Sequence, residues 1–245
     1  MRRALLCAGV GLVGGCAQAS IGNAPPDTNN NHGGSDARIV FDTPPPPIDT
    51  PQGPDAAKLI DMVESVDSTM TYGISLTCSD TGTGNTRDNI WYRVYRPSDF
   101  SVTDAFNITG VTFSVQESTG TPTATIKLGT YTGTIDATTL NAALISPLAM
   151  ATAPVPPTSG QTGENVIVPI AATVPAGAMF VVQVSLPDQD STGYMYIGAT
   201  NAGEHHPGYL SSTACSITVP TSTVSIAEGA MITAGEIIID VEGEY

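Results

Sequence analysis

The stretch TGVTFSVQE, residues 109–117, decides the fold. Apolar side chains occupy every second position in it, at Val111, Phe113 and Val115, and small or polar residues stand between them. A period of two is that of a β-strand with one buried face, because successive side chains of a strand point to opposite sides. The same alternation recurs in TATIKLGTY, residues 123–131. The pattern predicts strands that share one apolar core.

Further short apolar runs follow along the chain, and turn-forming stretches such as VPAG and LPDQDSTG separate them. These runs are NVIVPI (165–170), AMFVVQVSL (178–186), YMYIGA (194–199) and EIIIDVEG (236–243). Charged residues make up only 13% of the chain and threonine is abundant, a composition that suits half-buried pleated sheets. We predict an all-β domain over residues 58–245, an antiparallel β-sandwich of eight or nine strands, with a jelly roll as the expected form.

Two segments lack this strand pattern. PDAAKLIDMVESVD (54–67) has apolar residues at roughly helical spacing, which is compatible with a short helix or with a lead-in strand. ALISPLAMATAPVPPTSGQTGEN (143–165) carries Pro154, Pro156 and Pro157, which exclude a central strand. We expect a loop in that second segment.

The region before the domain, residues 16–57, is rich in Pro, Asn, Gly and Asp and poor in aliphatic and aromatic residues. Such a segment cannot bury enough apolar surface to offset the entropy lost on ordering, so the composition predicts a disordered linker. Four consecutive prolines, Pro44–Pro47, favour a stiff polyproline II spacer within it.

Residues 1–15 have the organisation of a secretory signal. Arg2 and Arg3 precede an apolar run that ends at Val13, which is shorter than the roughly 20 residues that cross a bilayer. The residues that follow, Val13-Gly14-Gly15-Cys16, resemble the lipobox of bacterial lipoproteins. The resemblance implies cleavage before Cys16, a diacylglyceryl thioether on its sulfur and an acylated new N-terminus.

The residues around Cys16 leave one alternative open. An ordinary secretory signal cut near Ala19 would discard Cys16 with the leader. If the lipoprotein resemblance holds, it implies a membrane-anchored, exported protein. Ala17 is not acidic, and in lipoproteins of some bacteria an acidic residue there accompanies retention in the inner membrane. We therefore expect the outer membrane or the cell surface.

The charge balance limits the classes of partner that the chain can bind. The chain has 8 Lys and Arg against 23 Asp and Glu, a formal net charge of -15. Removal of Arg2 and Arg3 leaves 6 basic residues against the same 23 acidic ones, or -17. A body this acidic lacks the positive surface that phosphate backbones need, so we expect no nucleic-acid binding. It is equally unsuited to adhesion on anionic lipid, and membrane contact would depend on the acyl chains.

The cysteines predict one disulfide. Cys7 lies in the signal and Cys16 is the proposed lipid site, which leaves Cys78 and Cys215 as an even pair in an exported chain. We predict that these two cysteines form a disulfide; a reactive free thiol is the alternative.

The C-terminal half resembles a β-sandwich module found at the C-terminus of many secreted bacterial proteins. In order, the matching positions are Val174 to Gly177, Pro187-Asp188, Ile197-Gly198, Asn201, Gly203, Tyr209, Cys215 and Pro220-Thr221. DNIWYRVYRPSDF (88–100) is similar to an upstream strand of that module. These positions are turns and core residues, so the resemblance implies a fold and an unassigned role. His205 and His206 depart from the module's pattern.

Aromatic side chains are the candidate binding residues. Alternation places Trp91 and Tyr95 on one face of their strand and Tyr92 on the other. An exposed aromatic face could stack on sugar rings or form a protein contact, whereas a buried face would belong to the core and Arg93 would be a paired cation. The same two interpretations apply to three further tyrosines, Tyr194, Tyr196 and Tyr209.

Candidate metal ligands are few. Asp188 and Asp190 lie in a turn whose carboxylates could wrap calcium, and Asp80 and Asp88 offer a similar loop; ordinary turn chemistry is the alternative. Glu204, His205 and His206 could bind a transition metal, but adjacent residues point to opposite sides and no zinc-binding spacing is present. We expect no transition metal, and calcium stays the only cofactor to consider.

The sequence contains no GxSxG motif and only 3 histidines, and we expect no enzymatic activity. The leading hypothesis is a lipid-anchored cell-envelope protein that displays a non-catalytic β-sandwich as an interaction or structural module. The alternatives are a carbohydrate-binding surface lipoprotein and an accessory partner of an envelope enzyme. An envelope protein or a polysaccharide is therefore the expected partner.

Overall fold

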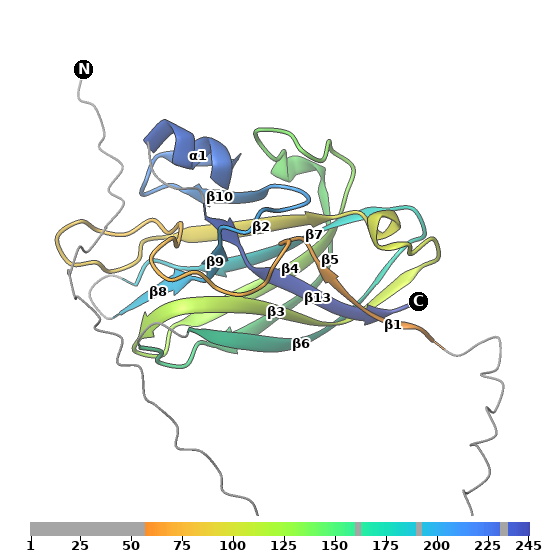
Figure 1. Ribbon diagram of the computed structural model, residues 1–245, viewed down its shortest axis with the longest axis horizontal. Coiled ribbons are helices and arrows are strands. Elements are labelled where there is room, and N and C mark those ends of the chain that lie inside the picture. The colour runs from red at the N-terminus through yellow and green to blue at the C-terminus, as the bar shows by residue number, and fades with distance from the viewer. Residues whose placement is uncertain (1–56, 160–162, 190–192, 231–234) are drawn as a thin grey trace, which may run out of the picture. The chain divides into compact units, whose positions relative to one another are not determined.

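The computed structural model describes residues 57–159, 163–189, 193–230 and 235–245 (Figure 1). The predicted signal (1–15), Cys16 and nearly all of the predicted linker (16–57) lie outside the described residues. No helix in the described part is long and apolar enough to cross a membrane.

The described residues form two main antiparallel sheets. The first sheet has the order β1-β13-β3-β6, and β8 also pairs with β3. Its strands are β1 (Leu59–Val63), β3 (Phe106–Thr119), β6 (Glu164–Val174), β8 (Tyr194–Ile197) and β13 (Ile239–Glu244). The second sheet has the order β11-β10-β2-β7-β4-β5. Its strands are β2 (Asn89–Tyr95), β4 (Thr123–Tyr131), β5 (Ile145–Pro154), β7 (Met179–Leu186), β10 (Gly208–Ser212) and β11 (Ile217–Ser222).

Smaller elements complete the described chain. Strands β9 (Ala199–Thr200) and β12 (Glu236–Ile237) pair with each other. Two short 3-10 helices, η1 (Pro97–Phe100) and η2 (Ala142–Leu144), and one α-helix, α1 (Thr223–Ala230), lie in the connections.

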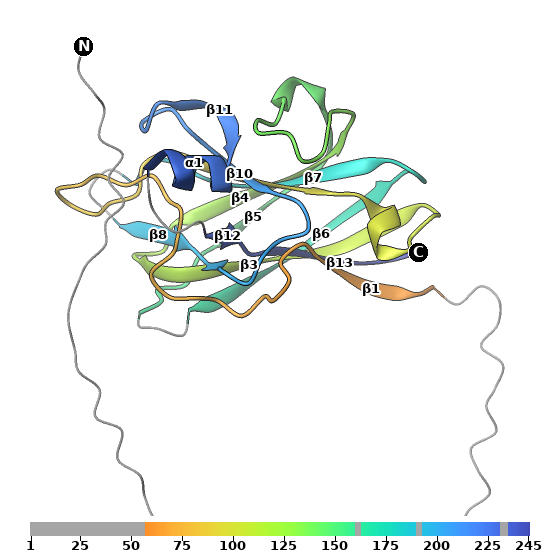
Figure 2. The ribbon, with the colours of Figure 1, turned by 45° about the horizontal axis from the view of Figure 1, so that its top comes forward.

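The strand orders confirm the predicted sandwich and identify its topology as a jelly roll. Eight strands, β1 to β7 and β13, build the two facing orders β1-β13-β3-β6 and β2-β7-β4-β5. This arrangement is the double Greek key of eight strands. The elements β8 to β12 and α1 all belong to one insertion between the seventh and the eighth jelly-roll strand (Figure 2). The described residues contain 13 strands, more than the eight or nine predicted, because the insertion adds the short strands β8 to β12.

The core lies between the two sheets, where the alternation placed it. Val111, Phe113 and Val115 of β3 are fully buried, and Tyr95 of β2 stacks on Phe180 of β7 with ring centroids 5.0 Å apart. Burial of side chains of this size contributes roughly 1.5–3 kcal/mol each relative to exposure. The alternating strand β3 therefore contributes one whole apolar face to this core.

A second apolar cluster covers the outer face of the second sheet. Tyr92, Val94, Val181 and Tyr209 pack there beneath residues 132–144, which contribute Ile135 and Leu140. The backbone N–H of Leu140 donates to the carbonyl of Pro220 at 2.9 Å, which fixes that segment against β11. Strand β2 is consequently covered on both faces.

Two segments that lack the alternating pattern in the sequence nevertheless form strands in the structure. Residues 59–63 of the lead-in segment form β1, which pairs with β13 and buries Met62. The segment expected to be a loop contains β5, and this expectation was wrong. Strand β5 is at the edge of its sheet, where the missing backbone N–H of Pro154 leaves no hydrogen bond to a neighbouring strand unmade. A register shift between β4 and β5 accommodates Pro147.

Strand β3 connects two opposite ends of the sandwich (Figure 1). Near its first residues lie Leu59 and Glu244, so we call this the terminal end. At its last residue, Thr119, β8 begins, and the loops before β2 and after β7 lie at the same end. We call this second end the disulfide end. A strand of 14 residues spans about 45 Å between them.

Candidate functional site at the disulfide end

A disulfide joins two long connections at this end. Cys78 and Cys215 are bonded with a Cα–Cα distance of 6.0 Å and a sequence separation of 137 residues. The bond fastens residues 78–88, which lead into β2, to residues 212–216, which follow β10. The pairing predicted from the cysteine count is confirmed.

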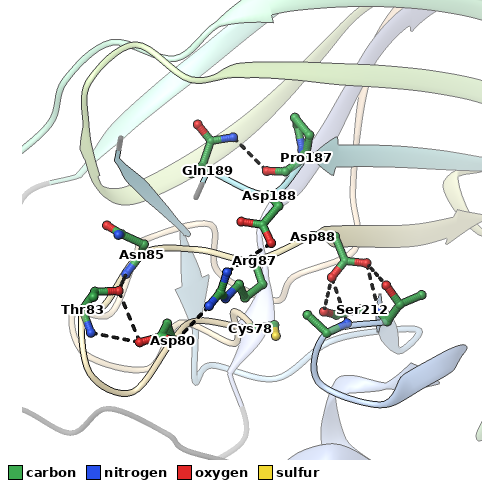
Figure 3. Close-up of polar contacts among 12 residues, drawn as sticks. Cys78, Asp80, Thr83, Asn85, Arg87, Asp88, Pro187, Asp188, Gln189 and Ser212 are labelled. Atoms are coloured by element: carbon green, nitrogen blue, oxygen red, sulfur yellow. Dashed lines mark hydrogen bonds and ion pairs between the residues drawn. The ribbon is translucent and has the colours of Figure 1, made fainter. Parts of the chain in front are cut away.

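Asp88 holds the second of these loops in shape (Figure 3). Its carboxylate accepts from the backbone N–H groups of Thr213 and Ala214, at 2.9 and 3.0 Å, and from the Ser212 hydroxyl at 3.0 Å. The Thr213 hydroxyl donates to it as well. Burial raises the pKa of Asp88, but these hydrogen bonds outweigh it and the pKa lies below its ordinary value. The carboxylate is therefore a loop clamp.

Arg87 joins the loop before β2 to one further loop (Figure 3). Its guanidinium lies 2.8 Å from Asp80 Oδ2 and 3.3 Å from Asp188 Oδ2. Asp80 Oδ1 also accepts from the backbone N–H groups of Gly82 and Thr83, at 2.9 and 3.1 Å. The Arg87 hydrogen bond, followed by those backbone donors, lowers the pKa of Asp80. The loop before β2 is thus bound to the loop after β7.

These contacts engage the calcium candidates that the structure describes. Asp80 and Asp88 point at protein donors, and Asp188 faces Arg87. Asp190 lies outside the described residues. Within the described ranges, no group of three His, Cys, Asp or Glu side chains is arranged to hold a metal ion.

Three tyrosines lie together beside these loops, and we call them the tyrosine platform: Tyr72, Tyr194 and Tyr196. The rings of Tyr194 and Tyr196, at alternate positions of β8, have centroids 5.2 Å apart and are tilted by 34°. Both rings are partly exposed, and Tyr72 is 46% exposed. Gly73, the residue after Tyr72, donates its N–H to Gln116 Oε1 at 2.9 Å, which places the turn that carries Tyr72 at the part of β3 directly before Glu117.

Hydrogen bonds fix two of these rings. The Tyr194 hydroxyl donates to Glu117 Oε1 at 2.8 Å, and the Tyr196 hydroxyl donates to the carbonyl of Gly84 at 2.7 Å. The bond to Glu117, more than burial, raises the pKa of Tyr194 to about 12. The two β8 rings are therefore held in place by their hydroxyl groups.

The other aromatic candidates are not available to a ligand. Trp91 and Tyr95 are fully buried between the sheets, Tyr92 is 5% exposed and Tyr209 is 1% exposed. An exposed aromatic face on β2 was one of two interpretations, and the structure contradicts it. The physical reason is that the core covers the inner face of β2 and residues 132–144 cover its outer face.

A buried charge network lies where the insertion meets the core. The guanidinium of Arg93 is fully buried, as a core-facing position of β2 requires, and it donates to Glu204 Oε2 at 2.5 Å and to the carbonyl of His206 at 2.8 Å. It also donates to the Ser65 hydroxyl at 3.3 Å and to the carbonyl of Ile237. Arg93 is thus the paired cation of the second interpretation.

Glu64 belongs to this network and was missed in the sequence. Its side chain is fully buried, and neither carboxylate oxygen has a hydrogen-bond partner among the described residues. Burial raises the pKa of Glu64 to about 7, although the positive charges of His206 and Arg93 act in the opposite direction. The only signal for it was an acidic residue directly after an apolar run, which is too common to be specific.

His206 connects the network to two surface loops. Its Nδ1 lies 2.7 Å from Asp136 Oδ1 and its Nε2 lies 2.8 Å from Asp99 Oδ2. Burial lowers the pKa of His206, but the two carboxylates outweigh it and the pKa lies above the ordinary value. Glu204 and His206 are therefore engaged by protein partners.

Comparison with known proteins gives no relative: no family model matches this chain, and no curated protein matches it.

Proposed function

We propose that the chain is an exported protein that a lipid on Cys16 anchors to a membrane of the cell envelope, and that its jelly roll is a non-catalytic binding module. The signal-like start and the lipobox-like residues before Cys16 support the anchor. The Cys78–Cys215 disulfide supports export, because structural disulfides persist in oxidising compartments and are rare in the cytosol. The acidic charge leaves the acyl chains as the source of membrane affinity.

The observation that carries the proposal is the placement of the fastened loops at the end opposite the chain's entry. The backbone N–H of Lys58 donates to the carbonyl of Tyr245 at 3.0 Å, so the domain begins at the terminal end. An anchor that precedes residue 57 would be joined to the domain at that end. The disulfide, the Arg87 pairs and the tyrosine platform lie about 45 Å away along β3, at the other end of the sandwich.

Two cysteine variants test the anchor. In the native host, Cys16→Ser should move the protein from the membrane fraction to the soluble fraction, while Cys7→Ser, a matched change within the signal, should leave it in the membrane. Mass spectrometry of the extracted protein should show an acylated N-terminal Cys16. Membrane retention of Cys16→Ser, or a mature N-terminus near residue 20, would contradict the proposal. Density-gradient separation of the two membranes then tests the outer-membrane or surface location.

A further inference from the structure

We propose that the tyrosine platform, Tyr72, Tyr194 and Tyr196, is a stacking site for a neutral polysaccharide. This inference rests on the proposed binding function and names its ligand class. The platform lies on the outer face of the first sheet at the disulfide end, because Met195 and Ile197 of β8 face the core and the tyrosines alternate with them.

The platform is organised before any ligand arrives. Glu117 and the carbonyl of Gly84 fix the hydroxyls of the two β8 tyrosines. Tyr72 sits in a turn whose next residue, Gly73, has a φ of 87°, and the Gly73 N–H donates to Gln116 Oε1 at 2.9 Å. Aromatic side chains held in place lose little conformational entropy on binding, so a larger share of the contact energy appears as affinity.

The surroundings of the platform suit a sugar. Gly84, whose carbonyl accepts from Tyr196, belongs to a loop rich in hydroxyl and backbone polar groups, of which Thr81, Gly82 and Thr83 are exposed, and Glu117 supplies a partly exposed carboxylate. Such groups hydrogen-bond the hydroxyls of a sugar whose apolar face stacks on an aromatic ring.

In the described residues, the exposed large aliphatic side chains belong to other elements. They are Leu59 at the terminal end, Val66 beside Gly203, Leu144, Leu148 and Met150 at or beside β5, Ile167 on β6 and Val219 on β11. The platform therefore presents aromatic and polar groups without an aliphatic centre.

The charge of the surface limits the class of polymer that the platform can bind. The nearest described cation in the loops, Arg87, is paired with Asp80 and Asp188, and Glu117 stands at the platform itself. A whole-chain charge of -15 repels anionic polymers as well. Acidic polysaccharides, nucleic acids and anionic lipids are thereby disfavoured, and a neutral glycan is the polymer that this surface fits.

The test uses the mature chain, purified in detergent from whole cells so that its recovery does not depend on the lipid. It is applied to affinity gels and pull-downs with neutral polysaccharides (β-glucan, xylan, mannan and chitin) and with anionic ones (alginate and polygalacturonate). At least one neutral polysaccharide should retain the protein, and Tyr72→Ala and Tyr194→Ala should each weaken retention about tenfold. Tyr245→Ala at the terminal end is the matched control and should bind like the parent chain. Tyr72 is exposed, so its removal should leave the fold intact, which Trp91 fluorescence verifies.

Three outcomes would overturn the inference. They are no retention by any neutral polysaccharide, equal retention of the platform variants and the parent chain, and retention by the anionic polymers alone. The binding assay does not depend on the lipid, whereas the Cys16→Ser fractionation does not depend on the platform. Failure of one is thus distinguishable from failure of the other.

Discussion

Replacement of the buried Glu64 by glutamine should stabilise the protein at alkaline pH. Glu64 is fully buried, its oxygens have no hydrogen-bond partner in the described chain, and burial raises its pKa from 4.5 to about 7. The positive groups that face it are Arg93 and His206, and the negative ones are Asp99 and Glu204. Because Glu204 already pairs with Arg93, an ionised Glu64 would be the excess charge of the network.

The sign follows from proton linkage. Below about pH 4.5 the carboxyl is protonated in both states and the folded state carries no penalty. Between pH 4.5 and about 7 the unfolded chain releases this proton and the folded chain keeps it, so the free energy of unfolding falls as pH rises. At about 1.4 kcal/mol for each pKa unit, the difference between 4.5 and about 7 amounts to roughly 3 kcal/mol above pH 7.

Glu64→Gln removes this titration and keeps the shape of the side chain. The variant should match the parent near pH 4.5 and exceed it by up to roughly 3 kcal/mol at about pH 8. Urea unfolding with the disulfide intact measures this, and the fluorescence of Trp91, the single tryptophan, reports the core. Glu228→Gln on the exposed face of α1 removes the same charge and should show no such gain. A difference between Glu64→Gln and the parent that is independent of pH, or a loss of stability at pH 8, would refute the reasoning.

Two further changes have expected outcomes. His206 stands between Asp99 and Asp136 with a raised pKa, so its stabilisation is complete below its unfolded pKa of 6.5 and is lost as pH rises through the folded value. His206→Gln should therefore cost about 1–2 kcal/mol in urea unfolding at about pH 5.5 and clearly less at about pH 9. Replacement of both Cys78 and Cys215 by serine should lower stability by about 4 kcal/mol, given the separation of 137 residues; an unchanged urea midpoint would contradict this.

The sequence predicted the jelly roll because its strands obey a local rule. Val111, Phe113 and Val115 alternate with polar residues, and burial on one side of β3 follows directly from that period. In the insertion, β8 and β12 lay in predicted apolar runs, whereas β10 and α1 show no such period. Strand β10 reads GYLSS and α1 reads TVSIAEGA, both too short for a period to emerge. Their conformation depends on contacts with β2 and β11, and a local sequence pattern does not predict such contacts.

The candidate site was predictable only in part. The pairing of Cys78 with Cys215 followed from counting cysteines. Tyr194 was named as a candidate because it is an aromatic residue in a predicted strand. Tyr92, like Tyr194, is an aromatic residue in a predicted strand, yet residues 132–144 fold over it and bury it. Which aromatic face stays exposed is decided by the segment that packs on it, and that segment is distant in the chain. Tyr72 was missed because no strand pattern contains it.

The two ends of the sandwich are held by different interactions, and this difference bears on where recognition occurs. At the terminal end the backbone pairing of β1 with β13 continues to the last residue, so regular structure orders the chain there. At the disulfide end residues 64–88 are mostly irregular, and ordering the backbone of each such residue costs roughly 1–2 kcal/mol. The disulfide, the Arg87 pairs and the Asp88 clamp offset that cost by fastening loops that are distant in sequence. Extended connections fixed by specific contacts are the usual place for binding residues on a rigid β scaffold, and the tyrosine platform lies beside those contacts.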